Sequence, residues 1–488
     1  MKHELLTGGI LAAFFTMSLA LAADEKVNYA ELKTSVSPQW ENLKSVDIIP
    51  CPKRITLYGQ NIGIDDNLAI AIGKKPSDLT KIAASDLQRL IFKQTSVEIP
   101  IVTYTSDSQK NNLIILGTLS ELPDMQEKCD NGKISFAEVE GQGYAIFPVN
   151  NGNRQNIVLL GKDNQGVYWS VMTLLQLITD KSIRLARILD WPDFKNRICE
   201  TLYTPAYLLY MAGNEQQKAK AWELIKAGVD EAARLKFNYI RCFEVIHSYP
   251  LTDYPLDKRA ELLGEIGKYV NARGMKLYFE FNVPVASQGD EKQFPQLKDC
   301  VKFRHLYFSW SDEELINHAC GKITEMATII GPQHYFLHSP DTPNMGWTSR
   351  SESDKKRWGN DRLSAETYLT NRVYRALKEG APNAEASYVS SPYGIGCTEN
   401  TREYNDFRKM AGELGRKLDK DIWLLWREGS LESAQKLRME TQNDPQGYYI
   451  ENSSFHSNRL VGGTARTAKT YYFKNGDRDF FYDNCNTS

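Results

Sequence analysis

The chain has 488 residues, of which 42% are hydrophobic and 25% charged, and its formal net charge is −2. This length exceeds that of one ordinary domain, and the composition is that of a globular protein with a large buried core. The near-neutral charge, without long basic or acidic runs, argues against nucleic acid and anionic membrane surfaces as partners.

The N-terminus has the pattern of a cleaved export signal. A short basic start precedes an apolar run over residues 5–21, and residues 20–22 (Ala-Leu-Ala) have the spacing of a cleavage site. We therefore expect a signal peptide over 1–22, an extended leader over 23–45, and an exported protein, periplasmic or extracellular, without a membrane anchor. A transmembrane anchor is the alternative, although the apolar run is short for one.

The region from residue 46 to 188 alternates short apolar runs with helical segments. The predicted strands are 55–57, 68–72, 97–102, 112–117, 143–146 and 157–160, and the first helix is 79–92. After the last strand, Gly161 forms a turn and Gly166 opens a segment with apolar residues at helical spacing. The pattern predicts a small mixed sheet with two helices, which closes near residue 185 and is followed by a short basic connection.

Two motifs stand at the end of this region. The second helix contains Asp163, Gly166, Thr173, Leu174, Gln176 and Leu177, and the segment after it contains Asp190, Trp191, Pro192, Phe194 and Arg197. Together they resemble the helix and the barrel entry that join the N-terminal domain to the catalytic barrel in β-N-acetylhexosaminidases of glycoside hydrolase families 20 and 84. The resemblance implies a hexosaminidase-type N-terminal α/β domain over 46–188 and a catalytic TIM barrel over 189–488.

From residue 190 onward short apolar strands alternate with helices. The predicted strands are 198–203, 239–245, 276–283, 335–338, 386–390, 422–426, 448–451 and 470–473, with helices at 219–235, 258–273, 312–330, 365–379 and 405–417. Eight strands that alternate with helices match an α/β fold of the (β/α)8 TIM barrel type. An open doubly wound sheet is the alternative, although the sequence contains no Gly-rich nucleotide-binding turn.

Carboxylates and aromatic residues follow the predicted barrel strands, where the active site of such a barrel lies. Asp341, in a loop between two prolines after the fourth strand, is the leading catalytic candidate, and Glu451 at the end of the seventh is the second. Glycoside hydrolysis commonly uses two carboxyl groups in this way. For Asp341 the alternative is a turn-forming aspartate. The residues expected to bind substrate are Asn452, Asn458, Glu244, Tyr203, Trp347, Trp426 and Tyr393.

The resemblance implies two roles for Asp341. The related families carry two adjacent carboxylates after the fourth strand: one orients the 2-acetamido group of the substrate, and the other is the acid/base. Here Asp341 stands between Pro340 and Thr342, so it can match either member of a degenerate pair. The lysine that family 84 carries after the second strand is also missing, and residues 241–244 occupy that stretch.

The cysteines give no sign of a metal site. Eight are spread along the chain, and none forms a Cys-x-x-Cys pair with metal spacing. We expect buried free thiols for most of them, although export would permit disulfides. We expect neither a metal nor a cofactor.

The resemblance therefore implies a glycoside hydrolase, most similar to β-N-acetylhexosaminidases, with a glycan as substrate and a substrate-assisted or two-carboxylate mechanism. The N-terminal pattern predicts that this hydrolase is exported. Two alternatives stay open. An α-glucuronidase-like hydrolase would need guanidinium groups for a uronate, and Arg241, Arg427 and Arg459 are available. A catalytically degenerate barrel would bind glycans without cleaving them. Nothing in the sequence indicates an oligomeric state.

Overall fold

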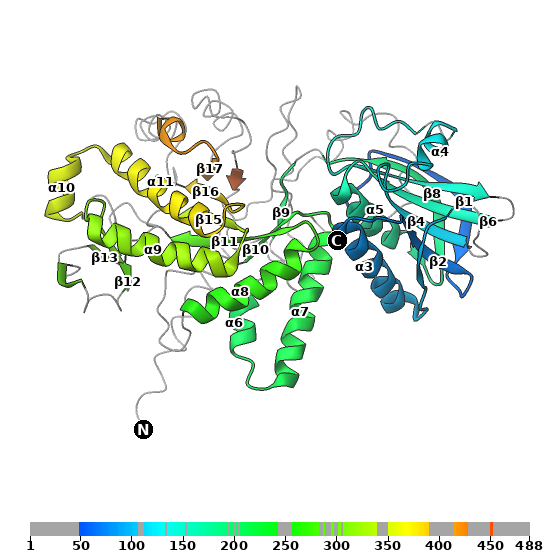
Figure 1. Ribbon diagram of the computed structural model, residues 1–488, viewed down its shortest axis with the longest axis horizontal. Coiled ribbons are helices and arrows are strands. Elements are labelled where there is room, and N and C mark those ends of the chain that lie inside the picture. Colours follow the sequence, from blue (N-terminus) through cyan, green and yellow to red (C-terminus); the bar gives the residue numbers. More distant parts are fainter. Residues whose placement is uncertain are drawn as a thin grey trace, which may run out of the picture. The chain divides into compact units, whose positions relative to one another are not determined.

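The computed structural model of the chain contains two large β-sheets and a small three-stranded one, with helices between their strands (Figure 1). The described residues are 48–105, 112–131, 134–151, 154–192, 195–199, 202, 205–242, 256–282, 286–287, 294–296, 301–303, 306–338, 350–389, 413–427 and 449–451. The expected signal peptide and leader lie outside these ranges. Within them, no helix combines the length and the apolar composition needed to cross a membrane.

The first sheet has eight strands in the order β1-β8-β5-β6-β4-β2-β3, with β7 paired to β8. The strands are β1 (Arg54–Gly63), β2 (Leu68–Ile72), β3 (Ile101–Thr103), β4 (Asn112–Thr118), β5 (Tyr144–Asn151), β6 (Arg154–Gly161), β7 (Ile178–Thr179) and β8 (Ser182–Asp190). Strands β3, β2, β4 and β6 run parallel, whereas β5, β8 and β1 pair antiparallel. The sheet is therefore mixed, as the sequence predicts.

Three helices cover the first sheet: α3 (Asp78–Thr95), α4 (Met125–Asn131) and α5 (Asn164–Gln176). Helix α4 packs on one face, where its Met125 joins a core that includes Ala69 and Ala71 of β2. Because side chains alternate along a strand, Leu68 and Ile70 face the other side, where α3 and α5 pack together (Figure 1). Covering on both faces explains why all of β2 is apolar.

The sequence prediction is wrong for the segment after α5. The expected basic connection is strand β8, which pairs with both β1 and β5. Its buried Ile183 and Leu185 alternate with the partly exposed Arg184, which is the pattern of a half-buried strand. Asp190 is accordingly the last residue of a strand and not part of a linker, and α4 is a third helix where two were expected.

Gly166 in helix α5 and Gly161 at the end of strand β6 allow other backbone segments to approach them closely. Asp163 caps α5, and its side chain accepts a hydrogen bond from the Gly166 amide at 2.8 Å. A Cβ atom on Gly166 would lie 2.0 Å from the carbonyl oxygen of Gly143, and one on Gly161 would lie 2.3 Å from that of Asp163. Only glycine fits at these two positions without a backbone shift.

Gly166→Ala is therefore expected to destabilise the protein by about 1–3 kcal/mol through overpacking against a backbone that cannot move locally. The measurement is the free energy of unfolding in urea. Gly321→Ala is the matched control, because a Cβ atom there, within another helix, would meet nothing within 4 Å. The control should be neutral or stabilising. Equal effects of the two substitutions would contradict the packing argument.

The second sheet has seven strands, all parallel, in the order β18-β17-β16-β15-β11-β10-β9. They are β9 (Ile198–Cys199), β10 (Tyr239–Cys242), β11 (Lys276–Asn282), β15 (His334–His338), β16 (Glu385–Val389), β17 (Ile422–Arg427) and β18 (Tyr449–Glu451). Each overlaps one of the eight strands predicted from the sequence. The eighth, 470–473, lies outside the described residues, so closure into a barrel stays a prediction.

Helices lie in the connections between the first five of these strands, from β9 to β16. They are α6 (Pro205–Tyr210), α7 (Glu215–Arg234), α8 (Leu256–Asn271), α9 (Glu313–Ile330), α10 (Glu352–Trp358) and α11 (Arg362–Gly380). A small antiparallel sheet of β12 (Ala286–Ser287), β14 (Leu306–Phe308) and β13 (Val301–Phe303) lies in the connection between β11 and α9. The described strands follow the chain order without the reversal that marks a doubly wound sheet.

Asp190, the first residue of the barrel-entry motif, connects the end of β8 to the segment that follows α7. The carboxylate of Asp190 accepts hydrogen bonds from the Tyr144 hydroxyl (2.8 Å), the Lys236 ammonium (3.0 Å) and the Lys53 amide (3.2 Å). Lys236 lies just after α7, and Thr173 of the helix motif shares a hydrogen bond of 2.6 Å with Tyr144. The Lys236 ammonium and the Asp190 carboxylate are both largely buried.

Two further motif residues have structural roles at this junction. Arg197 donates a hydrogen bond to the backbone carbonyl of Lys236 at 2.7 Å, and its guanidinium lies 5.8 Å from the ring centroid of Trp169. The side chain of Gln176 both donates to and accepts from the backbone of Ile49, each at 2.9 Å. The described residues of the two motifs therefore join parts of the chain.

A second junction is built around Asp86 of α3, a carboxylate that is 3% exposed. It accepts hydrogen bonds from the Tyr168 hydroxyl (2.9 Å) of α5, from Arg273 (2.9 Å) after α8, and from Arg89 (3.1 Å). Arg89 in turn donates twice to Asp230 of α7, at 2.9 and 2.7 Å. Helices that pack on the first sheet are thereby tied to helices between strands of the second.

Candidate active site

One face of the parallel sheet carries an aromatic core. Tyr239, Tyr278 and Phe336 from β10, β11 and β15 pack together with the side chain of Ile198 from β9. Arg241 lies two residues after Tyr239, so it has the same orientation in the strand. It is 3% exposed, and its guanidinium lies 5.8 Å from the ring centroid of Phe336. A buried cation therefore lies on this face, one residue before β10 ends.

The carboxyl ends of the seven parallel strands lie along one edge of the sheet. Strand β15 ends there at His338, three residues before Asp341, and Glu451 is the last residue of β18. In the backbone register Glu451 pairs with Arg427, and Trp426 pairs with Ile450. The structure therefore contains the two strands, β15 and β18, from which the predicted site positions were derived, and both end along this edge.

The side chains of the predicted site residues fall outside the described part of the chain. For Glu451 and Trp426 the structure describes the backbone alone. The remaining predicted residues lie in undescribed segments: Asp341, Asn452, Asn458, Glu244, Tyr203, Trp347 and Tyr393. Their catalytic and binding roles stay predictions.

A polar network that sequence reasoning missed lies at the opposite, amino ends of the strands. The carboxylate of Glu385 accepts hydrogen bonds from the Tyr239 hydroxyl (2.7 Å) and the Lys276 ammonium (2.5 Å). His334 lies 3.4 Å from the same carboxylate through Nδ1 and 2.9 Å from the Ser387 hydroxyl through Nε2. Adjacent parallel strands bring these residues together, although they are far apart in the sequence.

The contacts run from Ser387 to His334 to Glu385. A catalytic triad has the same sequence of contacts, from a nucleophile to a base to the group that orients the base. His334 is 0% exposed, however, and its ring stacks on Tyr278 at a centroid distance of 4.5 Å. The Tyr278 hydroxyl also lies 3.1 Å from the hydroxyl of Ser387. Ser387 and His334 are fully buried, and the group lies at the edge of the sheet opposite to the active sites of barrel enzymes. We interpret it as a structural network that links four strands.

The network holds its ionisable groups in defined charge states. Burial lowers the pKa of His334, and the nearby Glu385 opposes this only in part. Burial by itself raises the pKa of Glu385, but the hydrogen bond of His334 and the charge and hydrogen bond of Lys276 outweigh it and hold the pKa below its usual range. The network therefore favours a neutral imidazole beside an ionised carboxylate.

Acid is expected to weaken the fold through this network. Both pKa values are lower in the folded state, so the stabilisation is present above the unfolded-state values of 6.5 for His334 and 4.5 for Glu385 and is lost as pH falls below them. Glu385→Gln should remove on the order of 1–3 kcal/mol at about pH 7 and should flatten the pH dependence below about pH 4.5. Urea unfolding at several pH values measures both effects, and an unchanged acid slope in the variant would contradict this assignment.

The described cysteines are Cys51, Cys129, Cys199, Cys242 and Cys320, and each is a free thiol. The second, third and fourth of them are buried, as expected for structural thiols. Within the described ranges, no group of three His, Cys, Asp or Glu side chains is placed to hold a metal ion.

Residues 45–191 match the sequence model of glycosyl hydrolase family 20, domain 2. A comparison with curated protein sequences gives no match. In fold the chain is similar to CpGH84B, with a TM-score of 0.52 and 15% identity over 83% of this chain and 61% of that one. It is also similar to the chitobiase of Flavobacterium johnsoniae, with a TM-score of 0.55 and 13% identity over 83% of this chain and 59% of that one.

A third similar structure is the β-N-acetylhexosaminidase of Bacteroides fragilis, with a TM-score of 0.50 and 15% identity over 83% of this chain and 74% of that one. The chain thus spans less than two thirds of the length of the first two structures. Identities this low show a shared fold. The chain is therefore similar in sequence to domain 2 of glycosyl hydrolase family 20 over residues 45–191, and in fold to hexosaminidases of families 20 and 84 over 83% of its length.

Proposed function

We propose that the chain is a glycoside hydrolase that acts on glycans, most similar in activity to a β-N-acetylhexosaminidase. The proposal rests on the order of two segments along the chain. A segment that matches the second domain of family 20 leads directly into seven parallel strands in sequential order. The similar solved structures include a chitobiase and a β-N-acetylhexosaminidase with this fold.

In this proposal Asp341 supplies the acid chemistry or orients the substrate. As the acid, its carboxyl group donates a proton to the glycosidic oxygen while the bond from C1 to that oxygen breaks. The positive charge that develops at C1 is then met by the oxygen of the 2-acetamido group or by a second carboxylate, for which Glu451 is the candidate. Water then adds to C1 and displaces the acetamido oxygen or the second carboxylate, while the Asp341 carboxylate accepts the proton that the water loses.

A uronic acid glycan is the second candidate substrate, and Arg241 is the observation that favours it. Its guanidinium is buried on the face of the sheet that carries Phe336, close to the edge where barrel sites lie. Guanidinium groups bind carboxylates through paired hydrogen bonds, so a uronate would have a natural partner there. In both proposals, an N-acetylated sugar or a uronate, the substrate binds at the same edge of the sheet.

A panel of chromogenic aryl glycosides tests the proposal. We expect the purified protein to hydrolyse the N-acetylglucosaminide or the N-acetylgalactosaminide. Hydrolysis of the glucuronide alone would support the uronate alternative. Absence of hydrolysis across the panel, together with measurable glycan binding, would contradict an enzymatic function and support a barrel that only binds glycans.

A further inference from the structure

The short helix α6 and the turn that extends it expose apolar side chains where a surface helix normally presents polar ones. Tyr207, Leu208 and Met211, the α6 patch, are 39%, 40% and 59% exposed, and they are three of the eight large hydrophobic side chains that lie exposed in the described part of the chain. Hydrophobic residues exposed singly are ordinary, whereas a cluster of them marks a surface that binds a ligand or a partner. Residues 201–214, which include the α6 patch, contain no charged residue, although 25% of the chain is charged. The segment therefore has no charged side chain of its own to cover the helix.

The three side chains of the α6 patch lie on one face of the helix. The Met211 amide donates a hydrogen bond to the Tyr207 carbonyl at 2.9 Å, so the helical turn continues as far as Met211. Residues three and four positions apart are neighbours on a helix, which places Leu208 and Tyr207 beside Met211. Ala206 and Leu209, on the rest of the helix, are buried. The helix is therefore apolar on its buried and its exposed side, whereas an ordinary surface helix is apolar on one side alone.

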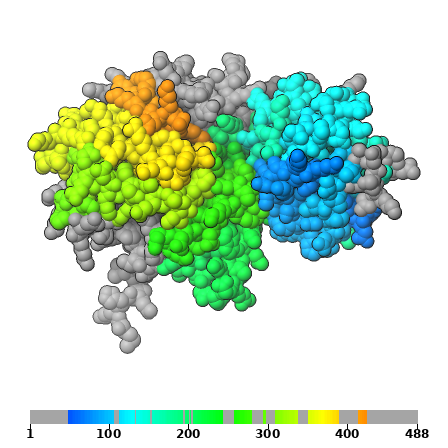
Figure 2. Space-filling model, viewed as in Figure 1, coloured from blue at the N-terminus to red at the C-terminus, as the bar shows by residue number. Residues whose placement is uncertain are grey.

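Helix α6 lies in the connection that leaves the carboxyl end of β9. Helices α6 and α7 form a helical hairpin (Figure 1), and α6 also packs against α8. In Figure 2 the surface of this hairpin is green and lies at the lower edge of the view. Only residues 200–204 separate Cys199, the last residue of β9, from Pro205, the first of α6. An extended chain of that length spans about 20 Å at most, so the helix begins near the edge of the sheet where the site is proposed.

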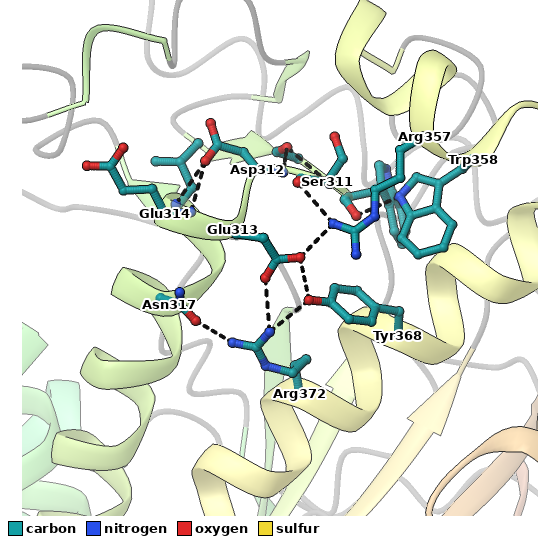
Figure 3. Close-up of polar contacts among 12 residues, drawn as sticks. Ser311, Asp312, Glu313, Glu314, Asn317, Arg357, Trp358, Tyr368 and Arg372 are labelled. Atoms are coloured by element: carbon teal, nitrogen blue, oxygen red, sulfur yellow. Dashed lines mark hydrogen bonds and ion pairs between the residues drawn. The ribbon is translucent and has the colours of Figure 1, made fainter.

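Two half-buried aromatic side chains in other connections of the sheet are already engaged within the protein (Figure 3). The Arg357 guanidinium lies 4.6 Å from the ring centroids of both Trp358 and Tyr368. The Tyr368 hydroxyl donates a hydrogen bond to the Glu313 carboxylate at 2.5 Å, and the indole of Trp358 donates one to the Trp310 carbonyl at 2.7 Å. Both rings therefore brace helices against one another, and we do not assign them to a ligand.

We propose that the α6 patch binds a sugar ring of a glycan, in addition to the ring at the proposed active site, an inference that rests on the proposed function. A pyranose ring has an apolar face of C–H groups, and such a face packs on the ring of a tyrosine. Leu208 and Met211 extend the apolar surface beside Tyr207, and the absence of charge over residues 201–214 suits a neutral sugar. The protein therefore takes an oligosaccharide, of which one ring lies on α6.

The size of the α6 patch favours a sugar over a protein partner. A protein–protein interface of ordinary size engages about 20–30 residues from each partner. The α6 patch has three side chains, on a helix of 6 residues and the turn after it. The neighbouring start of α7 exposes Glu215, Gln217 and Lys218, which are polar. Three apolar side chains cover one sugar ring, but they are too few to hold a second copy of the chain.

Tyr207→Ala and Tyr207→Phe test the stacking contact. The probe is the thio-linked β-1,4 tetramer of N-acetylglucosamine, whose sulfur-linked bonds resist hydrolysis, and the comparison ligand is N-acetylglucosamine itself, which has a single ring. Phe92→Ala is the matched control, because Phe92 is an aromatic side chain that is 53% exposed on α3 of the first sheet. Circular dichroism confirms that each variant is folded.

Titration followed by nuclear magnetic resonance measures the dissociation constants. We expect the wild type to bind the tetramer more tightly than the single sugar. Tyr207→Ala should raise the ratio of the Kd for the tetramer to the Kd for the single sugar about three- to tenfold, the range that an aromatic contact contributes. Tyr207→Phe keeps the ring and should hold this ratio within about twofold of the wild-type value, and Phe92→Ala should leave it unchanged.

The possible outcomes separate this inference from the proposed function. Loss of tetramer affinity in Tyr207→Ala supports the α6 patch as a sugar-binding surface, even if the wild type hydrolyses no glycoside and the proposed function fails. A folded Tyr207→Ala variant with the wild-type ratio overturns the inference and leaves glycoside hydrolysis intact, and so does a wild type that binds the tetramer no more tightly than the single sugar. A dimer in light scattering that Met211→Lys converts to a monomer would assign the α6 patch to a second copy of the chain and overturn the inference as well.

Discussion

Asp341→Asn is expected to lower the turnover of glycosides with poor leaving groups by about 10²- to 10⁴-fold, the range that a general acid contributes. Aryl glycosides with good leaving groups should lose less, because their leaving oxygen needs little protonation in the transition state. The measurement is kcat/KM for a series of aryl glycosides of increasing leaving-group pKa, compared between the variant and the wild type.

The second role predicted for Asp341 has a different signature. If the carboxylate orients a 2-acetamido group, the loss should be similar for good and poor leaving groups and should be confined to substrates that carry this group. Asp361→Asn is a suitable control, since Asp361 caps α11 on the surface and its side chain accepts from the Ser364 amide at 3.0 Å. Full activity of Asp341→Asn on every substrate would show that the residue only forms a turn.

Asp86→Ala is expected to lower the free energy of unfolding by about 3–5 kcal/mol, since it leaves the buried Arg273 without its carboxylate. Their oxygen and nitrogen atoms are 2.9 Å apart, and the two side chains are 4% and 7% exposed. The same substitution removes the acceptor of the Tyr168 hydroxyl. Urea unfolding monitored by tryptophan fluorescence measures the loss.

Two comparisons sharpen this prediction. Arg273→Met should be less harmful than Asp86→Ala, because Asp86 keeps its ion pair with Arg89 at 3.1 Å. Asp78→Asn, on the same helix, should have little effect, because the side chain of Asp78 is 97% exposed and its ion pair with Lys81 is open to solvent. A small loss in Asp86→Ala, comparable to that of Asp78→Asn, would contradict a structural role for this junction.

The local pattern of apolar residues predicted most of the strands, because each of these strands is a short apolar segment. Strand β2 has the bounds expected from the run at 68–72, and β10, β11, β15, β16, β17 and β18 overlap the expected barrel strands. Strand β8 was missed because its two arginines hide the alternation of buried residues. The glycine at 166 was predicted to open a helix, but the Gly143 carbonyl that excludes a side chain there comes from the turn before β5, 23 positions earlier in the chain.

The sequence predicted where the candidate site residues lie relative to the strands, but not which side chains contact one another. Knowing where strands end predicts that Asp341 and Glu451 follow the carboxyl ends of a parallel sheet. The network around Glu385 depends instead on contacts between distant residues, and Tyr239 and Glu385 are 146 positions apart. This pairing leaves no signal in the local sequence pattern.

A crystal structure of Asp341→Asn with a bound glycoside tests the central claim most directly. The ligand should be a glycoside with a poor leaving group that the wild type hydrolyses, which the variant is expected to bind without rapid turnover. The account predicts that the sugar lies at the carboxyl ends of the parallel strands, with its glycosidic oxygen or its 2-acetamido group within hydrogen-bond distance of residue 341. A sugar bound elsewhere on the protein, with residue 341 remote from it, would contradict the assignment of the active site.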